Sequence, residues 1–444
     1  MHRFTFFSKL LRQGTFTASS KEEGLASHKL LLHGGILSVS SPGTFVLSPI
    51  ALRVVDKLTA FIDYKMSEVG GQKCLFPTLG RSQLWAQSGR WEKFGADMFR
   101  LNDRTHEEEA CEFVHSFDLG SSVLPLRIYQ ISAKFRDEIK PKLGLLRCRE
   151  FLMKDMYSFD VDAEAAKETY DTLSNTYLEI FHTLRLPIFK VTAEGGLMGD
   201  CPSHEFHCLL PVGEDTLSVC PSCKKAVLAA NSGIATSGVL QDSRVCPDCG
   251  LSCQVSKVLQ MGCYGIGITR LLATALEYFT TTSTEGNPPT ELRWPSGFAP
   301  YSGAIALQKD NAKDALSTDE LNVVLARFRD FPSPSTSLTP GSTFFAGLLP
   351  RGDILVDDRP RLSLGRKLLD LRRLGVPWIL VAKSLQSSPS PEYELVDVNR
   401  GGISFAASLD DAATAFTCSD FEVPLLSVSD GQRKKLWHGS GVSR

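Results

Sequence analysis

Residues 127–154 are strongly basic, with eight Lys and Arg residues and three Asp and Glu residues. Arg136 and Glu138 precede a short basic turn, and Arg147 and Phe151 follow it. A guanidinium can bind two phosphate oxygens at once, and an aromatic ring can stack on a nucleotide base. This combination of side chains predicts a binding site for a nucleoside triphosphate.

Another arginine, preceded by two glycines, occurs at 261–270, where the sequence is MGCYGIGITR. Glycine lets the backbone at a strand–helix junction come close to a nucleotide, and Gly265 and Gly267 are spaced for this role. Arg270, at the start of the following helix, could then reach the terminal phosphates. We expect Arg136 and Arg270 to converge on one pocket. Two guanidiniums are costly to place side by side without an anion between them, so this convergence would imply a phosphate site.

Two Cys-x-x-Cys pairs lie 22 residues apart in the middle of the chain. Four thiolates at this spacing suit one tetrahedral zinc ion in a closed structural site, and a redox-active pair is the alternative. The predicted ligands are Cys220, Cys223, Cys246 and Cys249. The remaining cysteines, of twelve in all, are scattered, which favours a reducing compartment over a disulfide-bonded scaffold.

The elements that must position the arginines are a β-hairpin and the helices beside it. Alternating apolar residues at 128–132 and 151–153 predict two strands, and the Pro and Gly of 140–144 predict the turn between them. Apolar residues at helical spacing predict further helices, and a short run ending in Pro predicts a strand. These are the helices 50–67, 162–184 (capped by Asp160 or Asp162) and 271–278, and the strand 74–77.

Residues 281–292 are rich in polar residues, Gly and Pro, and we expect them to be a linker. Strand and helix patterns alternate beyond the linker, which predicts an α/β layer. Its elements are the strands 353–358, 377–382 and 393–398 and a helix at 363–374. Six basic residues surround that helix and could contact RNA or form a solvated face: Arg359, Arg361, Arg366, Lys367, Arg372 and Arg373.

The composition bounds the protein class without giving a function. At 444 residues two or three domains are expected, and the net charge of −2 confines any RNA contact to local basic patches. Every segment long enough to span a membrane contains Gly, Pro or a charged residue, so no transmembrane span or membrane association is predicted. The first twenty residues carry three basic residues and no acid, and Phe4, Phe7, Leu10 and Leu11 could share a helix face. We therefore predict that residues 1–28 are a mitochondrial targeting segment.

The hairpin sequence resembles motif 2 of the class II aminoacyl-tRNA synthetases. That motif reads Phe-Arg-x-Glu, a loop, then Arg-x-x-x-Phe, and residues 135–138 and 147–151 match it. The sequence of residues 134–159 is similar to that of the prolyl-tRNA synthetases of the bacterial and mitochondrial type. The resemblance implies an α+β catalytic domain with an antiparallel sheet and then a smaller α/β anticodon-binding-like domain. The boundaries expected are 29–280 for the catalytic domain with a zinc-ribbon-like insertion at 218–254, 293–427 for the second domain, and 428–444 for a tail.

The same resemblance implies the activity of a proline–tRNA ligase. ATP and proline would form prolyl-adenylate, with pyrophosphate leaving, and the prolyl group would pass to tRNA(Pro). Arg136 would neutralise charge near the α-phosphate, Glu138 would read the adenine amino group, and Phe151 would stack on adenine. Arg147 and Arg270 would hold the outer phosphates with Mg²⁺, while Gly265 and Gly267 (a motif 3 resemblance) line the nucleotide site.

Further residues follow from the resemblance alone. Thr105 and Glu107 match a Thr-x-Glu that contacts the prolyl nitrogen, and Ser203 and His204 belong to a matching Ser-His-Glu-Phe. A secondary ammonium offers two donors and a positive charge, which a hydroxyl and a carboxylate can satisfy. A helix–strand–Pro unit at 50–77 resembles motif 1, which implies a homodimer. The expected location is the mitochondrial matrix.

The sequence also departs from the family pattern in two places. Residues 102–104 directly precede Thr105 where the family has a strand ending in Gly-Pro, and only residues 254–260 stand where the family has a longer block. That block helps to wall the proline pocket, so we expect this chain to bind ATP but to activate proline weakly or not at all. The alternative function is a non-catalytic, synthetase-like protein that binds RNA or protein.

Overall fold

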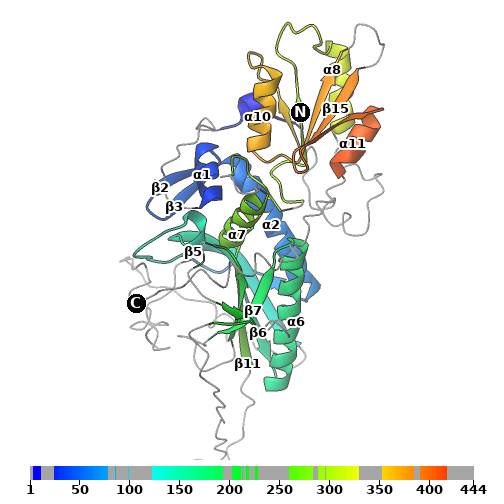
Figure 1. Ribbon diagram of the computed structural model, residues 1–444. Coiled ribbons are helices and arrows are strands. Elements are labelled where there is room, and N and C mark those ends of the chain that lie inside the picture. The colour runs from blue at the N-terminus through cyan, green and yellow to red at the C-terminus, as the bar shows by residue number, and fades with distance from the viewer. Residues whose placement is uncertain are drawn as a thin grey trace, which may run out of the picture.

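The computed structural model describes residues 4–11, 25–78, 86, 99, 123–193, 203–211, 213, 217–219, 226–228, 260–283, 289–295, 297–329, 353–384 and 391–417. They form two lobes (Figure 1). The catalytic lobe contains residues from 25 to 283, and the C-terminal lobe contains residues from 289 to 417 together with residues 4–11.

The central sheet of the catalytic lobe has the strand order β11-β6-β5-β4. Strands β5 (Leu126–Phe135), β6 (Glu150–Asp160) and β11 (Gln260–Gly267) are antiparallel neighbours, and β4 (Gln72–Lys73) adds one parallel pair at the edge. The predicted antiparallel sheet and its hairpin are thus confirmed. Both hairpin strands are longer than the alternation indicated, because their polar residues at the open end also pair across the ladder.

Two long helices cover one face of this sheet: α2 (Pro49–Glu68) and α6 (Ala163–Thr183). Tyr129 on β5 donates from its hydroxyl to Asp63 of α2 at 2.8 Å, and Arg127 donates to Thr169 of α6 at 3.0 Å. Asp162 caps α6 by accepting the amide of Ala165 at 2.9 Å, as predicted. Because side chains alternate along a strand, the even-numbered residues of β5 point to the opposite face.

Smaller elements surround the sheet. Helix α7 (Ile268–Thr282) follows β11. It contacts helix α1 (Ala26–His33) and the 3₁₀ turn η3 (Gly144–Leu146). A separate hairpin of β2 (Leu37–Ser41) and β3 (Thr44–Leu47) contacts α1 and α2. A second sheet has the order β8-β7-β10-β9. Its strands are β7 (Ile188–Ala193), β8 (Ser203–Cys208), β9 (Leu217–Val219) and β10 (Ala226–Leu228).

The strand expected at 74–77 is wrong. Strand β4 ends at Lys73, and residues 74–77 continue as irregular backbone. The amide of Phe76 donates to the side-chain Oε1 of Gln130 at 3.1 Å, and Pro77 has no amide hydrogen to offer. Backbone pairing with β5 therefore ends at the Cys74 amide, which donates to the carbonyl of Tyr129 at 2.8 Å, and a side-chain partner takes its place at Phe76.

The C-terminal lobe is an α/β layer with the strand order β1-β13-β12-β14-β15-β16. The first four strands are parallel and the last two are antiparallel additions. The bounds are β1 (Thr5–Phe6), β12 (Gly303–Ala306), β13 (Ile354–Asp357), β14 (Trp378–Lys383), β15 (Glu392–Asp397) and β16 (Gly402–Ala406), with helices α8 (Thr318–Phe328), α10 (Leu364–Arg373) and α11 (Leu409–Thr417). The predicted elements of this layer are confirmed to within about two residues.

The N-terminal residues belong to this C-terminal sheet. Thr5 and Phe6 pair in parallel with Leu355 and Val356, and the 3₁₀ turn η1 (Phe7–Lys9) follows. The predicted helix with an apolar face is therefore wrong for these residues, because the backbone finds partners on a distant strand. The assignment of residues 1–28 to a targeting segment stays a prediction.

Within the described ranges no helix is both long enough and apolar enough to cross a membrane.

Candidate active site

The open face of the catalytic sheet carries the predicted nucleotide residues. Phe151 and Met153 of β6 point to this face, and the register places Met153 beside Gly267 and Asp155 beside Gly265. A Cβ atom added at Gly265 would lie 2.4 Å from the Cε of Met153. Gly265 and Gly267 therefore leave a stretch of sheet surface without side chains, called the glycine floor, between the side chains of β6 and the start of α7.

Arg136 lies at the end of β5, next to Phe151. Its amide donates to the carbonyl of Arg149 at 2.9 Å, which continues the pairing of the hairpin. Its guanidinium carbon is 5.4 Å from the centroid of the Phe151 ring. This is cation–π distance, so the ring offers a surface that either a cation or a planar base can cover.

Arg270 lies in the first turn of α7, and its Nε donates to the carbonyl of Leu146 at 2.8 Å. Partial burial lowers the pKa of Arg270 from its ordinary value, and repulsion from Arg136 and Arg147 lowers that pKa further. Charges perturb one another in this way only at short range. Arg270 therefore lies against the hairpin loop and on the same side of it as Arg136, whose charge it senses.

Glu138 and Arg147 are partners across the mouth of the hairpin. Arg147 Nε lies 2.9 Å from Glu138 Oε2, and this hydrogen bond lowers the pKa of Glu138. The predicted roles place the two side chains on different parts of ATP, so this ion pair must rearrange if both roles are correct. Leu143 and Gly144 supply the left-handed backbone of the turn, at φ values of 57° and 60°.

The hairpin loop rests on the β2–β3 hairpin. Arg149 donates its amide to the carbonyl of Gly43 at 2.7 Å, and its side chain pairs with Asp137. A Cβ atom at Gly43 would lie 2.7 Å from the Cβ of Pro141. Gly43, which also has a φ of +78°, is therefore needed for this close approach.

The Ser-His-Glu-Phe segment lies on strand β8, so its successive side chains point to opposite faces of the sheet. Nδ1 of His204 lies 2.6 Å from the hydroxyl of Tyr170 on α6, and burial followed by the charge of Lys190 lowers the pKa of His204. Ser203 begins the strand. Glu205 points to the other face, where its Oε2 lies 2.9 Å from Nε2 of His207, and its charge raises the pKa of Arg270. Sequence reasoning passed over Glu205, although the alternation of side chains along a strand could have identified it.

A polar cluster on the floor was also missed. The carboxylate of Asp155 accepts from Gln130 Nε2 at 3.0 Å and from the Tyr157 hydroxyl at 3.1 Å, and Lys134 Nζ lies 3.1 Å away. All four residues share the open face by strand register. Polar residues at every second position of a predicted strand were the signal for this cluster.

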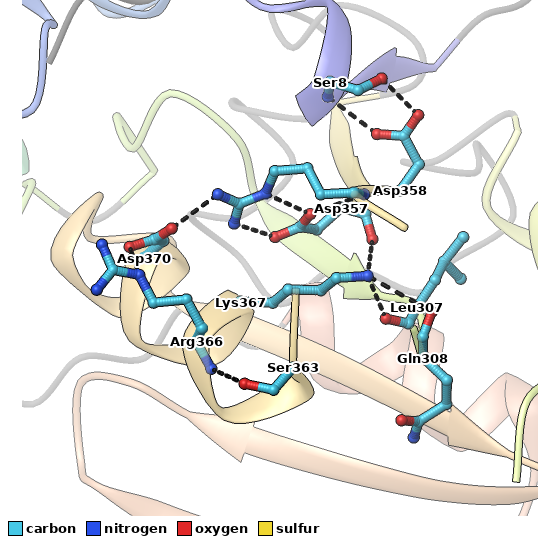
Figure 2. A network of polar contacts seen from close by, with 10 residues as sticks. Ser8, Leu307, Gln308, Asp357, Asp358, Ser363, Arg366, Lys367 and Asp370 are labelled. Atoms are coloured by element: carbon cyan, nitrogen blue, oxygen red, sulfur yellow. Dashed lines mark hydrogen bonds and ion pairs between the residues drawn. The ribbon is translucent and has the colours of Figure 1, made fainter. Parts of the chain in front are cut away.

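The second basic cluster contains both buried and exposed residues. Figure 2 shows Lys367 and Arg366 of α10 with their polar partners. Lys367 is fully buried, and its Nζ donates to the carbonyl of Leu307 at 2.7 Å. Arg359 forms ion pairs with Asp357 at 2.6 Å and with Asp370 at 2.7 Å. Arg366 and Arg372 keep side-chain exposures of 42% and 44%. Each of these two arginines also pairs with a carboxylate, Arg366 with Asp370 at 3.2 Å and Arg372 with Glu291 at 3.1 Å, and contact of this cluster with RNA stays a prediction.

Six predicted site residues lie outside the described residues: Thr105, Glu107, Cys220, Cys223, Cys246 and Cys249. Among the residues that are described, no group of three or more His, Cys, Asp or Glu side chains is placed to hold a metal ion.

Comparisons with known proteins agree with this geometry. Residues 103–279 match the family model for the tRNA synthetase class II core domain (G, H, P, S and T). The chain is 35% identical over 419 residues to a protein of Rattus norvegicus named "Probable proline--tRNA ligase, mitochondrial", covering 85% of this chain and 82% of that protein. A protein of the same name from Schizosaccharomyces pombe is 31% identical over 397 residues, covering 81% and 86%.

The fold agrees with that of a solved structure. Prolyl-tRNA synthetase from Cryptosporidium parvum, complexed with halofuginone and AMPPNP, has a TM-score of 0.60 over 88% of this chain and 75% of that chain, at 14% identity. The arginines, the aromatic ring and the glycine floor lie on the class II core that both chains share in fold. Given its 35% identity over most of the length of such a relative, this chain belongs to the class II aminoacyl-tRNA synthetases, in the family of the proline–tRNA ligases.

Proposed function

We propose that this chain is a mitochondrial proline–tRNA ligase that activates proline with ATP and charges tRNA(Pro). The observation that carries the proposal is the approach of Arg136 and Arg270 to each other beside Phe151 and above a glycine floor. Two exposed guanidiniums held together in this way suit a bound phosphate chain. The retention of this arrangement in a chain related to ligases favours the enzyme over a non-catalytic binding protein.

The chemistry needs no covalent nucleophile from the protein. The carboxylate of proline attacks the α-phosphorus of ATP, the bond to the β-phosphate oxygen breaks, and pyrophosphate leaves. Arg136 stabilises the charge that develops at the α-phosphate, and Phe151 stacks on adenine. Arg147 and Arg270 hold the outer phosphates. Positioning and electrostatic stabilisation therefore supply the rate enhancement.

Mg²⁺ would accompany ATP and reduce the negative charge on its phosphates. The carboxylate of Glu205 is an oxygen ligand of the kind this ion prefers, and its charge acts on Arg270 at the phosphate end of the site. Its side chain is 57% exposed, and its Oε2 pairs with Nε2 of His207 at 2.9 Å, so a bound ion would have to share or replace that contact.

Proline recognition is assigned to Thr105 and Glu107 for the imino nitrogen, with Ser203 and His204 beside them. The hydrogen bond between Tyr170 and His204 holds the imidazole in one orientation, and the lowered pKa of His204 favours its neutral form. A neutral imidazole beside a cationic substrate avoids repulsion.

The remaining parts of the proposal concern assembly and location. A homodimer would use the edge of the catalytic sheet, where the described strands end at β4 and the side chain of Leu75 is 78% exposed. Cys220, Cys223, Cys246 and Cys249 would hold a structural Zn²⁺ with four soft donors. The mitochondrial names of the relatives support action in the matrix.

Proline-dependent exchange of pyrophosphate into ATP by the purified protein tests the proposed function. Exchange together with charging of a tRNA(Pro) transcript supports it. ATP binding without exchange would instead agree with the expectation that the short segment 254–260 leaves the proline pocket open. Binding of tRNA with neither ATP binding nor exchange would favour the non-catalytic alternative.

A further inference from the structure

Asp353 is a fully buried carboxylate that stands immediately before β13 in the C-terminal lobe. It receives donors from both lobes. Lys57 Nζ of α2 lies 2.7 Å from its Oδ2, and Arg53 Nη2 of α2 pairs with its Oδ1. Ser302 of its own lobe donates to Oδ2 from the hydroxyl at 2.7 Å and from the amide at 3.1 Å.

The two cations of α2 also bind the backbone that precedes β12. Arg53 Nε donates to the carbonyl of Pro300 at 2.8 Å, and Lys57 Nζ donates to the carbonyl of Ala299 at 2.6 Å. The Arg53 guanidinium lies 4.4 Å from the centroid of the Tyr301 ring. Arg53 and Lys57 are four residues apart, so they share one face of α2, and every one of these contacts crosses between the lobes.

Two members of this cluster, Lys57 and Asp353, are shielded from water, whereas the side chain of Arg53 is 24% exposed. The side chain of Lys57 is 5% exposed, and the ring of Phe61 on α2 packs 5.5 Å from the ring of Phe298. Burial lowers the pKa of Lys57 more than the Asp353 carboxylate raises it. One hydrophobic cluster includes residues of α2 and of the C-terminal sheet, so the lobes are joined by apolar packing as well as by charge.

Apolar packing alone would tolerate sliding of one lobe over the other, whereas this charge cluster has one satisfied geometry. Two cations without the carboxylate would repel each other in a dry site, and the carboxylate without the cations would be buried and unpaired. Helix α2 is also tied to the catalytic sheet, since Tyr129 of β5 donates to Asp63 at 2.8 Å. Contacts are therefore continuous from Asp353 through α2 to β5, the strand that ends beside Arg136.

We propose that Asp353, Arg53 and Lys57 form an interlobe latch that fixes the C-terminal lobe relative to the catalytic sheet so that one tRNA can engage both. These are positioning residues for the transfer step. Formation of the adenylate requires only groups of the catalytic lobe, so it does not depend on the latch. The inference rests on the proposed function, because that function supplies a substrate long enough to span both lobes.

The test compares Asp353→Asn and Arg53→Met with a matched control, Glu394→Gln. Lys383 and Glu394 form an ion pair within the C-terminal lobe, with side-chain exposures of 24% and 14%. Each full-length variant is assayed for proline-dependent pyrophosphate exchange and for the kcat/KM of tRNA(Pro) charging. Thermal unfolding identifies any variant that fails to fold, and Arg53→Met, which changes a partly exposed side chain, stays informative if Asp353→Asn does not fold.

We expect exchange within about twofold of the unchanged protein in both latch variants, with kcat/KM for tRNA lowered at least tenfold and mainly through KM. The control should keep both activities. A parallel loss of exchange and charging in folded latch variants, or no loss of charging, would overturn the latch.

If the unchanged protein shows neither exchange nor charging, the proposed function fails, and small-angle X-ray scattering then decides the latch by itself. The latch variants should give a broader distribution of interatomic distances than the unchanged protein and the Glu394→Gln control. An unchanged distribution would refute the latch.

Discussion

Two arginine clusters of similar appearance in the sequence have opposite environments in the two lobes. In the catalytic lobe Arg136 is exposed, and repulsion from it contributes to lowering the pKa of Arg270. In the C-terminal lobe burial alone would lower the pKa of Arg359, but hydrogen bonds and charge from Asp357 and Asp370 reverse the effect and raise it (Figure 2). The first cluster presents cations to a ligand, whereas much of the second is neutralised inside the fold.

The difference lies in the position of the carboxylates. Asp357 and Asp370 are buried, and they form paired contacts with Arg359 that fix its guanidinium. Among the described residues no carboxylate forms an ion pair with the side chain of Arg136 or Arg270. A run of basic residues therefore predicts a binding surface only after the acids near it in space are known.

The largest expected effect comes from breaking the internal cluster. Asp357→Asn removes the charge that Arg359 binds through two nitrogens, at 2.8 Å and 2.6 Å. The free energy of unfolding should fall by about 3 kcal/mol, because the mostly buried guanidinium of Arg359 loses one of its two carboxylate partners and keeps only Asp370. Urea unfolding measures this change. The control Asp410→Asn breaks an ion pair whose carboxylate is 79% exposed, and it should cost less than about 1 kcal/mol.

Arg136→Ala should lower activity and leave stability nearly unchanged, which is the opposite of the effect expected for Asp357→Asn. The side chain is exposed, so stability should hardly change, while pyrophosphate exchange should fall by about two decades, as expected for one donor to developing charge. Arg327→Ala, which removes an arginine from the C-terminal lobe, is the control and should leave exchange unchanged. Equal rates for Arg136→Ala and the unchanged protein would remove Arg136 from the site.

Much of the fold could be predicted because its signals are local. Helix α6 combined an apolar stripe with the cap Asp162, and α10 began at Ser363, whose hydroxyl accepts the amide of Arg366. The nucleotide face followed from the hairpin and the glycines. The pairing of Thr5 with Leu355 could not be predicted, because no local periodicity records a partner 350 positions away.

The burial of charged residues could not be predicted either, because it also depends on packing that the local sequence does not show. Lys367 lies on the same short helix as the exposed Arg366, and only the packing of α10 on the sheet separates a fully buried ammonium from a surface guanidinium. The helical period could have placed Lys367 and Leu371 on one face. A lysine at such a position is, however, more often exposed, so the pattern alone did not identify its burial.

Lys154 extends the comparison to a buried cation in the catalytic lobe. It is fully buried, its Nζ donates to the carbonyl of Tyr264 at 2.9 Å, and it contacts the Tyr177 ring. Burial lowers its pKa from 10.5 to about 7, with Asp155 opposing. The unfolded chain therefore binds more protons between pH 7 and 10.5, and stability should rise with pH across that window.

Lys154→Met should flatten this dependence. The unchanged protein should gain at most about 1.4 kcal/mol per pH unit from this group between pH 7.5 and 9.5, and the variant should lack that gain. Urea unfolding at several pH values measures the slope. Lys73→Met removes a lysine that is 49% exposed and should leave the slope as it was. A variant with the slope of the unchanged protein would show that Lys154 is not the responsible group.

The smallest effect concerns the N-terminal segment that joins the neutralised cluster. The Ser8 hydroxyl donates to Asp358 at 2.6 Å, its amide donates to the same carboxylate at 2.9 Å, and the Arg359 guanidinium lies 3.9 Å from the Phe7 ring centroid. Ser8→Ala removes only the hydroxyl bond, so the full-length protein should lose about 1 kcal/mol. Ser67→Ala, whose hydroxyl bonds the carbonyl of Tyr64 within its own helix, is the control and should cost less.

The same variant tests whether residues 1–28 are removed as a targeting segment. If they are removed in the mitochondrion, Ser8→Ala will destabilise the full-length recombinant protein but not protein purified from mitochondria, because the latter has lost β1 and Ser8. If the segment is retained as part of the C-terminal sheet, both preparations will show the same loss. N-terminal sequencing of the mitochondrial protein provides an independent reading, and a mature N-terminus beyond Lys9 would mean that β13 forms the sheet edge without β1.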